Sequence, residues 1–295
     1  MDIETVGVAG GGLMGHGIAQ VAAQAGYQVR LREVDQERLD GAIGKIEKQL
    51  ARAVDKGKME QSAADEVRAR LHPTLDLGEF ADCQLVIEAI TESLPLKLEL
   101  WKELDEIVGD DSAVLATNTS SLAVVDQAVA TKRPNRFIGL HFFNPAQVMP
   151  LLEVIRTVTT DDDAFDTGLE FGKKIGKSVV RAKDKTGFIV NRLLVPYMLD
   201  AIRAYEEGVG SIEDIDSAMK GGAAHPMGPF TLLDFVGLDT TKSIADIMFD
   251  EYRERRFAAP PTLRKMVSAG WYGKKSGRGF YDYSGEKPVA VDPGL

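Results

Sequence analysis

Two side chains near the middle of the chain have the types and the spacing for acid–base chemistry. His141 ends the apolar stretch of residues 137–140, and Glu153 lies inside a second apolar stretch, residues 151–155. An unpaired carboxylate would be costly to bury there, so we expect the two groups to meet if these stretches are neighbouring strands. The carboxylate would hold the imidazole in one tautomer and stabilise its protonated form, which makes histidine a stronger base near neutral pH. A purely structural ion pair is the alternative.

Further polar side chains fall at the ends of predicted strands, where open α/β sheets bind their ligands. Residues 116–121 follow a short strand, and their hydroxyl and amide groups either cap the next helix or orient a ligand oxygen. Glu92 and Lys97 follow the strand-like residues 85–89, and they lie either on the ligand side or at a solvated helix start. Asn191 has apolar neighbours near the start of a helix, so its amide requires a polar partner.

Three glycines near the N-terminus have the spacing of a dinucleotide-binding turn. Gly10, Gly12 and Gly15 follow the strand-like residues 6–9 and open a helical pattern. Glycine allows the tight turn at the first position, lets the backbone approach a pyrophosphate at the second, and lets helix and strand pack closely at the third. The helix N-terminus then offers partial positive charge and free N–H groups to the phosphates.

A carboxylate lies where the ribose of such a cofactor is expected. Glu33 ends the second predicted strand, about 20 residues beyond the glycine turn. A carboxylate hydrogen-bonds the ribose hydroxyls and repels a 2′-phosphate, so the sequence predicts NAD rather than NADP as cofactor. Arg32 leaves tolerance of the phosphate open, because an arginine beside this position is able to pair with it.

Alternating strand and helix patterns position these residues. Helical patterns cover residues 36–56, 62–71 and 94–108, and strand-like runs occur at residues 6–9, 27–31, 84–90, 113–116, 136–140, 151–157 and 177–181. We therefore predict an α/β fold whose N-terminal domain, residues 1–184, is a doubly wound, Rossmann-type sheet. Helical patterns dominate afterwards, so we predict a smaller all-helical C-terminal domain over residues 185–295. The tail after Tyr283 is expected to be disordered or peripheral.

The composition limits the function classes. The chain has 295 residues, enough for about two domains, and its formal net charge is -10. No large basic field is available for nonspecific nucleic-acid binding, and no stretch approaches the roughly 20 apolar residues that cross a bilayer. The acidic start lacks the pattern of a secretory signal, so we expect a cytoplasmic protein. The one cysteine, Cys83, cannot supply a disulfide or a zinc site by itself, so no metal site is predicted and we expect it to be buried.

With these residues in view, the sequence resembles the L-3-hydroxyacyl-CoA dehydrogenase family, which includes short-chain 3-hydroxybutyryl-CoA dehydrogenases. The resemblance covers nearly all of residues 5–283. Six ordered motifs carry it: GGGLMG at 10–15, NTSSL at 118–122, GLHFFNP at 139–145, GFIVNR at 187–192, HPMGPF at 225–230 and GKKSGRGFY at 273–281.

The resemblance implies reversible, NAD-dependent oxidation of an (S)-3-hydroxyacyl-CoA to a 3-ketoacyl-CoA. It makes His141 the general base for the 3-hydroxyl proton and Glu153 the group that orients and charges it. Ser120 and Asn191 would hydrogen-bond the reacting oxygen. The cofactor contacts that it implies, together with those of the glycine turn, are Gly10, Gly12, Leu13, Met14, Gly15, Glu33, Glu92, Lys97, Ser120, Asn144 and Lys275.

The resemblance also implies how the coenzyme A group and a second subunit bind. Residues 45–58 are locally basic, and Lys56 falls on a family contact position for coenzyme A. Gln49 stands where some members have a serine, and Ser93 stands where an asparagine is frequent. Family members commonly dimerise through the C-terminal domain, so we expect a homodimer. No nucleic-acid or membrane partner is expected.

Two other functions are compatible with the fold. A related hydroxyacid or sugar-acid dehydrogenase would keep the glycine turn and lose acyl-CoA recognition, but residues 118–122 with His141 and Asn191 argue against it. A non-catalytic NAD-binding protein is disfavoured by the complete set of His141, Glu153, Ser120 and Asn191. The preferred acyl chain length and the metabolic pathway depend on features that the residues of these motifs do not encode.

Overall fold

The computed structural model describes residues 2–293 and divides the chain into two compact units. The first unit is Met1–Phe188 and the second is Ile189–Leu295, so the division falls four residues beyond the predicted boundary at 184. Asp184 explains the difference, because its carboxylate accepts hydrogen bonds from the Val124 and Val125 amides and keeps the following residues attached to the first unit.

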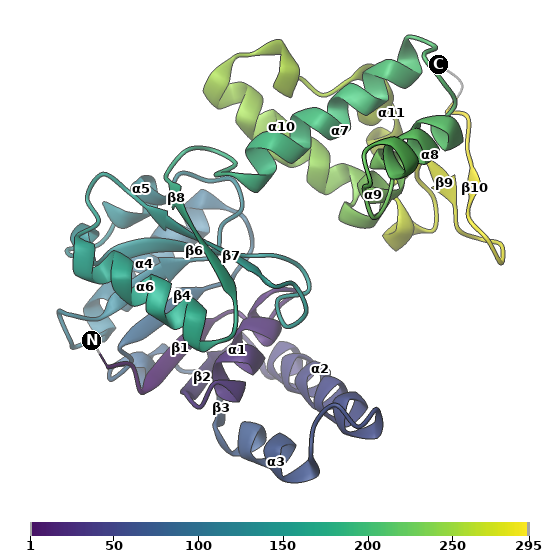
Figure 1. The fold of residues 1–295 in the computed structure, drawn as a ribbon. Coiled ribbons are helices and arrows are strands. Elements are labelled where there is room, and N and C mark those ends of the chain that lie inside the picture. Colours follow the sequence, from purple (N-terminus) through teal and green to yellow (C-terminus); the bar gives the residue numbers. More distant parts are fainter. Residues whose placement is uncertain (1, 294–295) are drawn as a thin grey trace. The chain divides into compact units, whose positions relative to one another are not determined.

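The first unit contains an eight-stranded sheet in the order β3-β2-β1-β4-β5-β6-β7-β8 (Figure 1). β6 and β7 pair antiparallel, and the other neighbouring strands pair in parallel. This confirms the doubly wound fold class. The strands are β1 (Thr5–Ala9), β2 (Gln28–Arg32), β3 (Leu71–Thr74), β4 (Leu85–Glu88), β5 (Val114–Thr117), β6 (Phe137–Phe142), β7 (Leu151–Arg156) and β8 (Ser178–Lys183).

Helices cover both faces of this sheet, which is why β4, β5 and β6 are buried along their whole length. Apolar residues of α1, α2 and α6 form the core on one face, and those of η1, α4 and α5 form the core on the other, where Cys83 is fully buried. The helices are α1 (Gly15–Gln24), α2 (Gln36–Asp55), α3 (Gln61–Ala69), η1 (Leu77–Phe80), α4 (Leu94–Ile107), α5 (Val124–Ala128), η2 (Pro134–Arg136) and α6 (Asp162–Lys174).

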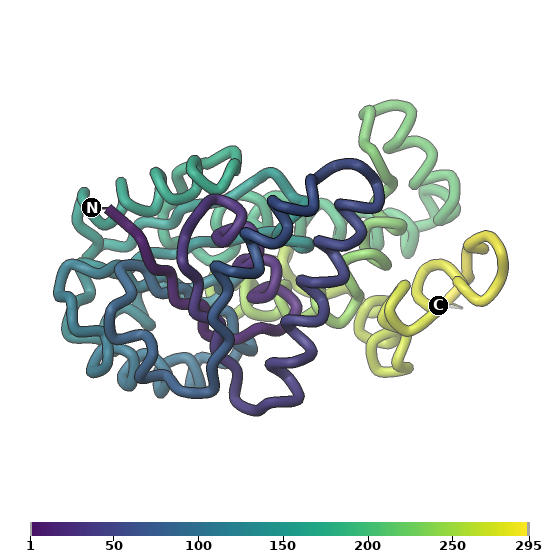
Figure 2. The backbone as a smooth tube through the Cα atoms, turned by 90° about the horizontal axis from the view of Figure 1, so that it is seen from below, coloured from purple at the N-terminus to yellow at the C-terminus, as the bar shows by residue number. Residues whose placement is uncertain are grey.

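The second unit is helical, as predicted, with one small hairpin near its end. Figure 2 shows the hairpin in the yellow part of the tube, and β10 falls within the tail that the sequence suggested was disordered or peripheral. The elements are α7 (Val190–Glu206), α8 (Ile212–Gly222), α9 (Pro229–Val236), α10 (Leu238–Tyr252), η3 (Arg255–Phe257), α11 (Pro261–Ser268), η4 (Lys274–Ser276), β9 (Tyr281–Asp282) and β10 (Val289–Ala290).

Two buried carboxylates organise the second unit. Asp216 accepts hydrogen bonds from the Phe230 amide, from Thr231 and from the Tyr281 hydroxyl. Asp234 accepts bonds from the backbone amides of residues 280 and 281 and from a tyrosine hydroxyl. The motifs at 225–230 and 273–281 therefore wrap around two acids, which gives them a structural role in addition to any contact with ligands.

We expect the stability of the second unit to depend on the protonation of Asp234. Burial raises the pKa of this carboxyl to about 6, against hydrogen bonds from Phe280, Tyr281 and Tyr283 that act to lower it. Because folding raises this pKa, protonation of Asp234 stabilises the folded state by about 3 kcal/mol below about pH 4, and this stabilisation is lost as the pH rises through about 6. Urea unfolding of the wild type and of Asp234→Asn from pH 4 to 8 measures it, since asparagine does not titrate. A constant difference in unfolding free energy between the two proteins would contradict the expectation.

Candidate active site

His141 and Glu153 meet across the antiparallel pair β6–β7. The two residues are directly opposite in the strand register, and His141 Nδ1 lies 2.6 Å from Glu153 Oε2. Glu153 is 0% exposed and His141 is 5% exposed, so water screens their interaction weakly. With Nδ1–H donating to the carboxylate, the neutral imidazole carries its free lone pair on Nε2, where it is able to accept a proton.

Two aromatic rings fix the plane of the histidine. The Phe143 ring lies 4.5 Å from the His141 ring, and the Phe188 ring lies 5.5 Å from it. Phe188 is buried and adopts a positive φ of 45°, a conformation that bulky residues rarely take. Sequence reasoning gave neither phenylalanine a role, because nothing in the local pattern shows which ring faces the imidazole.

A hydrogen-bonded loop lies at the carboxyl ends of β4, β5 and β6. Glu92 accepts bonds from Thr119 Oγ1 at 2.5 Å and from the Ser120 amide at 2.9 Å. Asn118 Oδ1 accepts a bond from the Phe142 amide at 3.0 Å, which ties the loop to the strand that carries His141. Burial acts to raise the pKa of the Glu92 carboxyl, but Lys97 and these hydrogen bonds together hold it below its usual value.

Lys97 is not at a solvated helix start. It lies in the first turn of α4, is 1% exposed, and its Nζ is 2.6 Å from Glu88 Oε1 and 3.3 Å from Glu92 Oε2. Glu88 ends β4, is 0% exposed and was not singled out from the sequence. The argument made for Glu153 applies to Glu88 as well, because an acid inside an otherwise apolar strand requires a buried partner.

The glycine turn is exposed at Gly12. A Cβ at Gly12 would meet nothing within 4 Å, and no side chain caps the N-terminus of α1. Glu33, at the end of β2, is nearly buried, and its carboxylate accepts bonds from the Gly11 amide at 2.7 Å and from the Val34 amide at 3.1 Å. This open backbone surface beside a fixed carboxylate fits the pyrophosphate and ribose of NAD. Leu13 is exposed beside the turn, and Met14 is half-buried.

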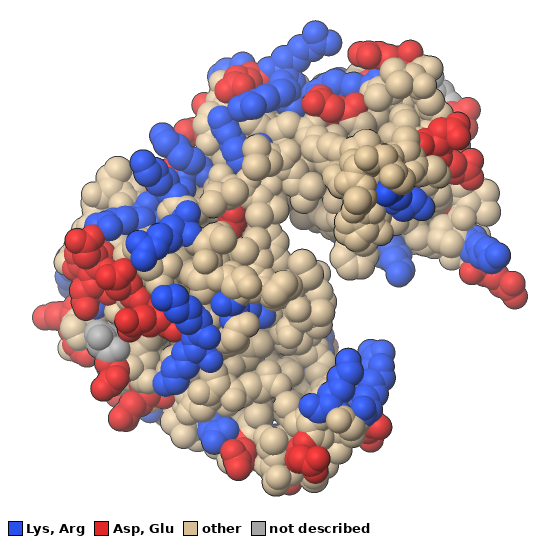
Figure 3. Space-filling model, in the orientation of Figure 1, with Lys and Arg blue, Asp and Glu red and all other residues tan. Residues whose placement is uncertain are grey.

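The residues predicted to contact coenzyme A lie on α2 and at its end. Gln49 is half-buried, and its Nε2 is 3.4 Å from His16 Nε2. Lys56 follows the last turn and is exposed. Figure 3 shows Lys and Arg side chains gathered over α2, and the exposed basic residues of this segment are Lys45, Lys48, Arg52, Lys56 and Lys58.

The remaining predicted contacts are spread over both units. Asn144 follows β6 in the first unit and is exposed. In the second unit, Asn191 is the second residue of α7, and Lys275 Nζ is bonded to the carboxylate of Asp239 at 2.6 to 2.7 Å.

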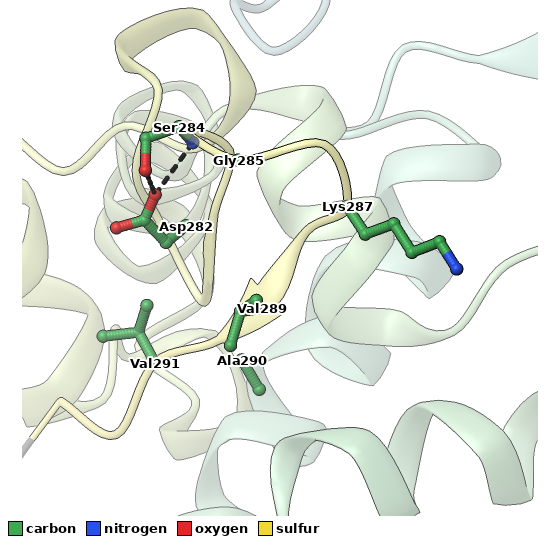
Figure 4. A pocket seen from close by; sticks show the side chains of 7 residues that line it. All are labelled: Asp282, Ser284, Gly285, Lys287, Val289, Ala290 and Val291. Carbon is green, nitrogen blue, oxygen red and sulfur yellow. Dashed lines mark hydrogen bonds between the residues drawn. The ribbon is translucent and has the colours of Figure 1, made fainter.

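Two surface hollows lie away from these residues. One, of about 410 Å³, runs along the β9–β10 hairpin (Figure 4), where Ser284 bonds to Asp282 and the Lys287 side chain points away. The other, of about 500 Å³, lies between α2 and the turn after β3. Among residues 2–293, no group of three or more His, Cys, Asp or Glu side chains is arranged to hold a metal ion. Within the same residues, no helix has the length and apolar character needed to cross a membrane.

A doubly wound sheet with a glycine-rich turn after its first strand, followed by a helical unit, is typical of two-domain proteins that bind a dinucleotide. The family model of the 3-hydroxyacyl-CoA dehydrogenase NAD binding domain matches residues 5–185, and that of the C-terminal domain matches residues 187–283. The chain belongs to the 3-hydroxyacyl-CoA dehydrogenase family, as the resemblance of its motifs predicted, and NAD is its cofactor.

Known proteins resemble the chain over almost its whole length. A 3-hydroxybutyryl-CoA dehydrogenase of Mycobacterium tuberculosis is 50% identical over 282 residues, which are 95% of this chain and 99% of that protein. The human mitochondrial hydroxyacyl-coenzyme A dehydrogenase is 47% identical over 288 residues, which cover 95% of this chain and 91% of that protein. The crystal structure of (S)-3-hydroxybutyryl-CoA dehydrogenase from Ralstonia eutropha has a TM-score of 0.93 at 37% identity and covers 96% of this chain and 100% of that chain.

Proposed function

We propose that the protein interconverts (S)-3-hydroxyacyl-CoA and 3-ketoacyl-CoA reversibly with NAD, and that it prefers short-chain substrates such as 3-hydroxybutyryl-CoA. The observation that carries the proposal is the buried His141–Glu153 pair, which lies on β6 and β7 beside the loop of residues 118–121. The names of the similar bacterial proteins support the short-chain preference.

His141 is the general base of this mechanism. When bound, the cofactor supplies the acceptor for the hydride that leaves C3 of the substrate. His141 Nε2 takes the proton of the 3-hydroxyl, and Glu153 stabilises the imidazolium through Nδ1–H. Ser120 and Asn191 hydrogen-bond the reacting oxygen. In the reverse direction the imidazolium returns its proton to the ketone oxygen.

The binding residues follow from the same proposal. The open backbone at Gly12 and the uncapped start of α1 receive the pyrophosphate, and Glu33 receives the ribose. Gln49 and Lys56, on and just after the basic α2 segment, contact the phosphate-bearing part of coenzyme A. The further cofactor contacts are Gly10, Leu13, Met14, Gly15, Glu92, Ser120, Asn144 and Lys275, and Lys97, which is 1% exposed, contributes to cofactor binding through its ion pair with Glu92. The protein acts in the cytoplasm as a homodimer formed through residues 185–295.

One assay tests the activity. Purified protein is mixed with NADH and acetoacetyl-CoA, and the fall in NADH absorbance is followed. We expect turnover that weakens when the acyl chain is lengthened. Turnover only with hydroxyacids or sugar acids lacking coenzyme A would favour the related dehydrogenase instead, and NADH binding without any turnover would favour a non-catalytic protein.

Cofactor choice tests the role of Glu33. We expect a strong preference for NADH over NADPH, and we expect Glu33→Ala to reduce that preference by about tenfold or more, because a charged hydrogen bond contributes about 1.5–3 kcal/mol. The measurement is kcat/KM for each cofactor. Glu37→Ala is the control, since this exposed acid lies in the first turn of α2. Equal loss of activity with both cofactors in Glu33→Ala would argue against discrimination by this carboxylate.

A further inference from the structure

The ion pair between Glu88 and Lys97 is almost completely removed from solvent. Glu88 Oε1 is 2.6 Å from Lys97 Nζ and also accepts a bond from the Ile90 amide at 2.8 Å. Its second oxygen accepts a bond from Thr117 Oγ1 at 2.7 Å. The exposed fractions of Glu88 and Lys97 are 0% and 1%.

Stability alone is a poor explanation for such a pair. Removing two charges from water offsets most of their mutual attraction, and well-packed apolar side chains of similar volume often stabilise a fold as well or better. Apart from Glu88 and Thr117, the strands β4 and β5 are apolar. Apolar side chains at these positions would not hold charged and hydrogen-bonding groups in a fixed place.

The pair continues into the loop at the sheet edge. Lys97 Nζ also contacts Glu92 Oε2 at 3.3 Å, and the other oxygen of Glu92 accepts bonds from Thr119 and from the Ser120 amide. Thr117 provides a second connection, because its Oγ1 donates to Glu88 and accepts a bond from the Thr119 amide at 3.2 Å. Both connections end on the segment that carries Ser120.

We infer that Glu88 and Lys97 are positioning residues for the reaction, which act through Glu92 and Thr117 to fix residues 118–121 and the Ser120 hydroxyl at the cofactor end of the sheet. This inference rests on the proposed function of Ser120. It explains why Lys97, in the first turn of α4, is buried between two carboxylates, and it assigns the contribution of Lys97 to cofactor binding to its effect on Glu92.

Four variants test the inference. Glu88→Gln keeps the shape of the side chain and removes its charge, Lys97→Met removes the cation, and the double variant removes both charges. Thr117→Val keeps both charges of the pair and breaks only the second connection. Asp105→Asn is the matched control, because Asp105 is a buried acid on the same helix that pairs with Arg133 at 2.9 Å, away from the sheet edge.

The measurements are the urea unfolding midpoint, kcat and KM with NADH and acetoacetyl-CoA, and the NADH dissociation constant from fluorescence. We expect each single charge variant to raise the KM and dissociation constant for NADH by about tenfold, and Thr117→Val to raise them less. Asp105→Asn should lower the unfolding midpoint and keep both constants within about twofold of wild type. The double variant should recover the urea unfolding midpoint, because it leaves neither charge of the pair buried without its partner. Its NADH binding should stay as weak as that of the single variants.

Two results would overturn the inference. One is wild-type NADH binding and kinetics in Glu88→Gln, Lys97→Met and Thr117→Val. The other is a double variant that recovers midpoint and NADH binding together, which would make the pair purely structural. Absence of turnover in the wild type would refute the proposed function instead, and the NADH dissociation constants would still decide the role of the pair.

Discussion

Replacing His141 with alanine is expected to lower kcat for acetoacetyl-CoA reduction by about a hundred- to ten-thousand-fold, the usual contribution of a positioned acid or base. The imidazole is the ring at this sheet edge whose Nδ1 lies 2.6 Å from a fully buried carboxylate, that of Glu153. The KM for NADH should change little, because the glycine turn lies between β1 and α1 and Glu33 follows β2, whereas His141 lies on β6. Stopped-flow absorbance of NADH measures the chemical step directly.

His72→Ala is the control for this prediction. His72 is exposed on β3 and pairs with Gln28 at 2.8 Å, so its loss should leave kcat unchanged. The kcat of Glu153→Gln should lie between those of His141→Ala and His72→Ala, because the amide still orients the ring but no longer stabilises the imidazolium. Near-normal activity in His141→Ala with a normal unfolding midpoint would remove His141 from the mechanism.

Gly12→Ala is expected to weaken NADH binding by about a hundredfold, or about 2.7 kcal/mol, with no loss of stability. The added methyl group would meet nothing within 4 Å in the protein, so the fold tolerates it. It would occupy the space through which the backbone approaches the pyrophosphate. Isothermal titration with NADH and an unfolding curve on the same sample separate the two effects.

Two other glycine substitutions serve as comparisons for Gly12→Ala. Gly15→Ala should destabilise the first unit as well as abolish binding, because its methyl group would overlap the Gly10 carbonyl oxygen. Gly41→Ala, on the exposed side of α2, should keep NADH binding and raise stability slightly. Unchanged NADH affinity in Gly12→Ala would show that the pyrophosphate binds elsewhere.

The features predictable from the sequence are those with a strong local pattern. The glycine turn, the buried strands and the second, helical domain each depend on residues close together in the chain. The proximity of His141 and Glu153 was predictable because a carboxylate in an apolar strand requires a partner, and the antiparallel register of β6 and β7 supplies one.

Several of the missed features depend on tertiary contacts, although α6, which was also missed, has a local signal in its Asp161 N-cap. β3 is a four-residue edge strand that contains Pro73 and lacks an apolar run, so its pairing with β2 leaves no local signal. Asp216 and Asp234 occur in helices, where acids are usually solvated, and their hydrogen-bond donors come from other segments: residues 230, 231 and 281 for Asp216, and residues 280–283 for Asp234. Glu88 and Lys97 are separated by a loop, so their contact also follows from the fold rather than from spacing.

The buried thiol of Cys83 has a practical consequence. Burial, as the largest influence, raises the pKa of this thiol to about 12, so it stays protonated and unreactive at neutral pH. Since the chain has one cysteine, only cysteines introduced at exposed positions would be reactive. Two such cysteines, one in each unit, would accept a fluorescent donor and acceptor without removal of the native residue. Energy transfer between them would then report whether the units approach each other when NADH and an acyl-CoA bind.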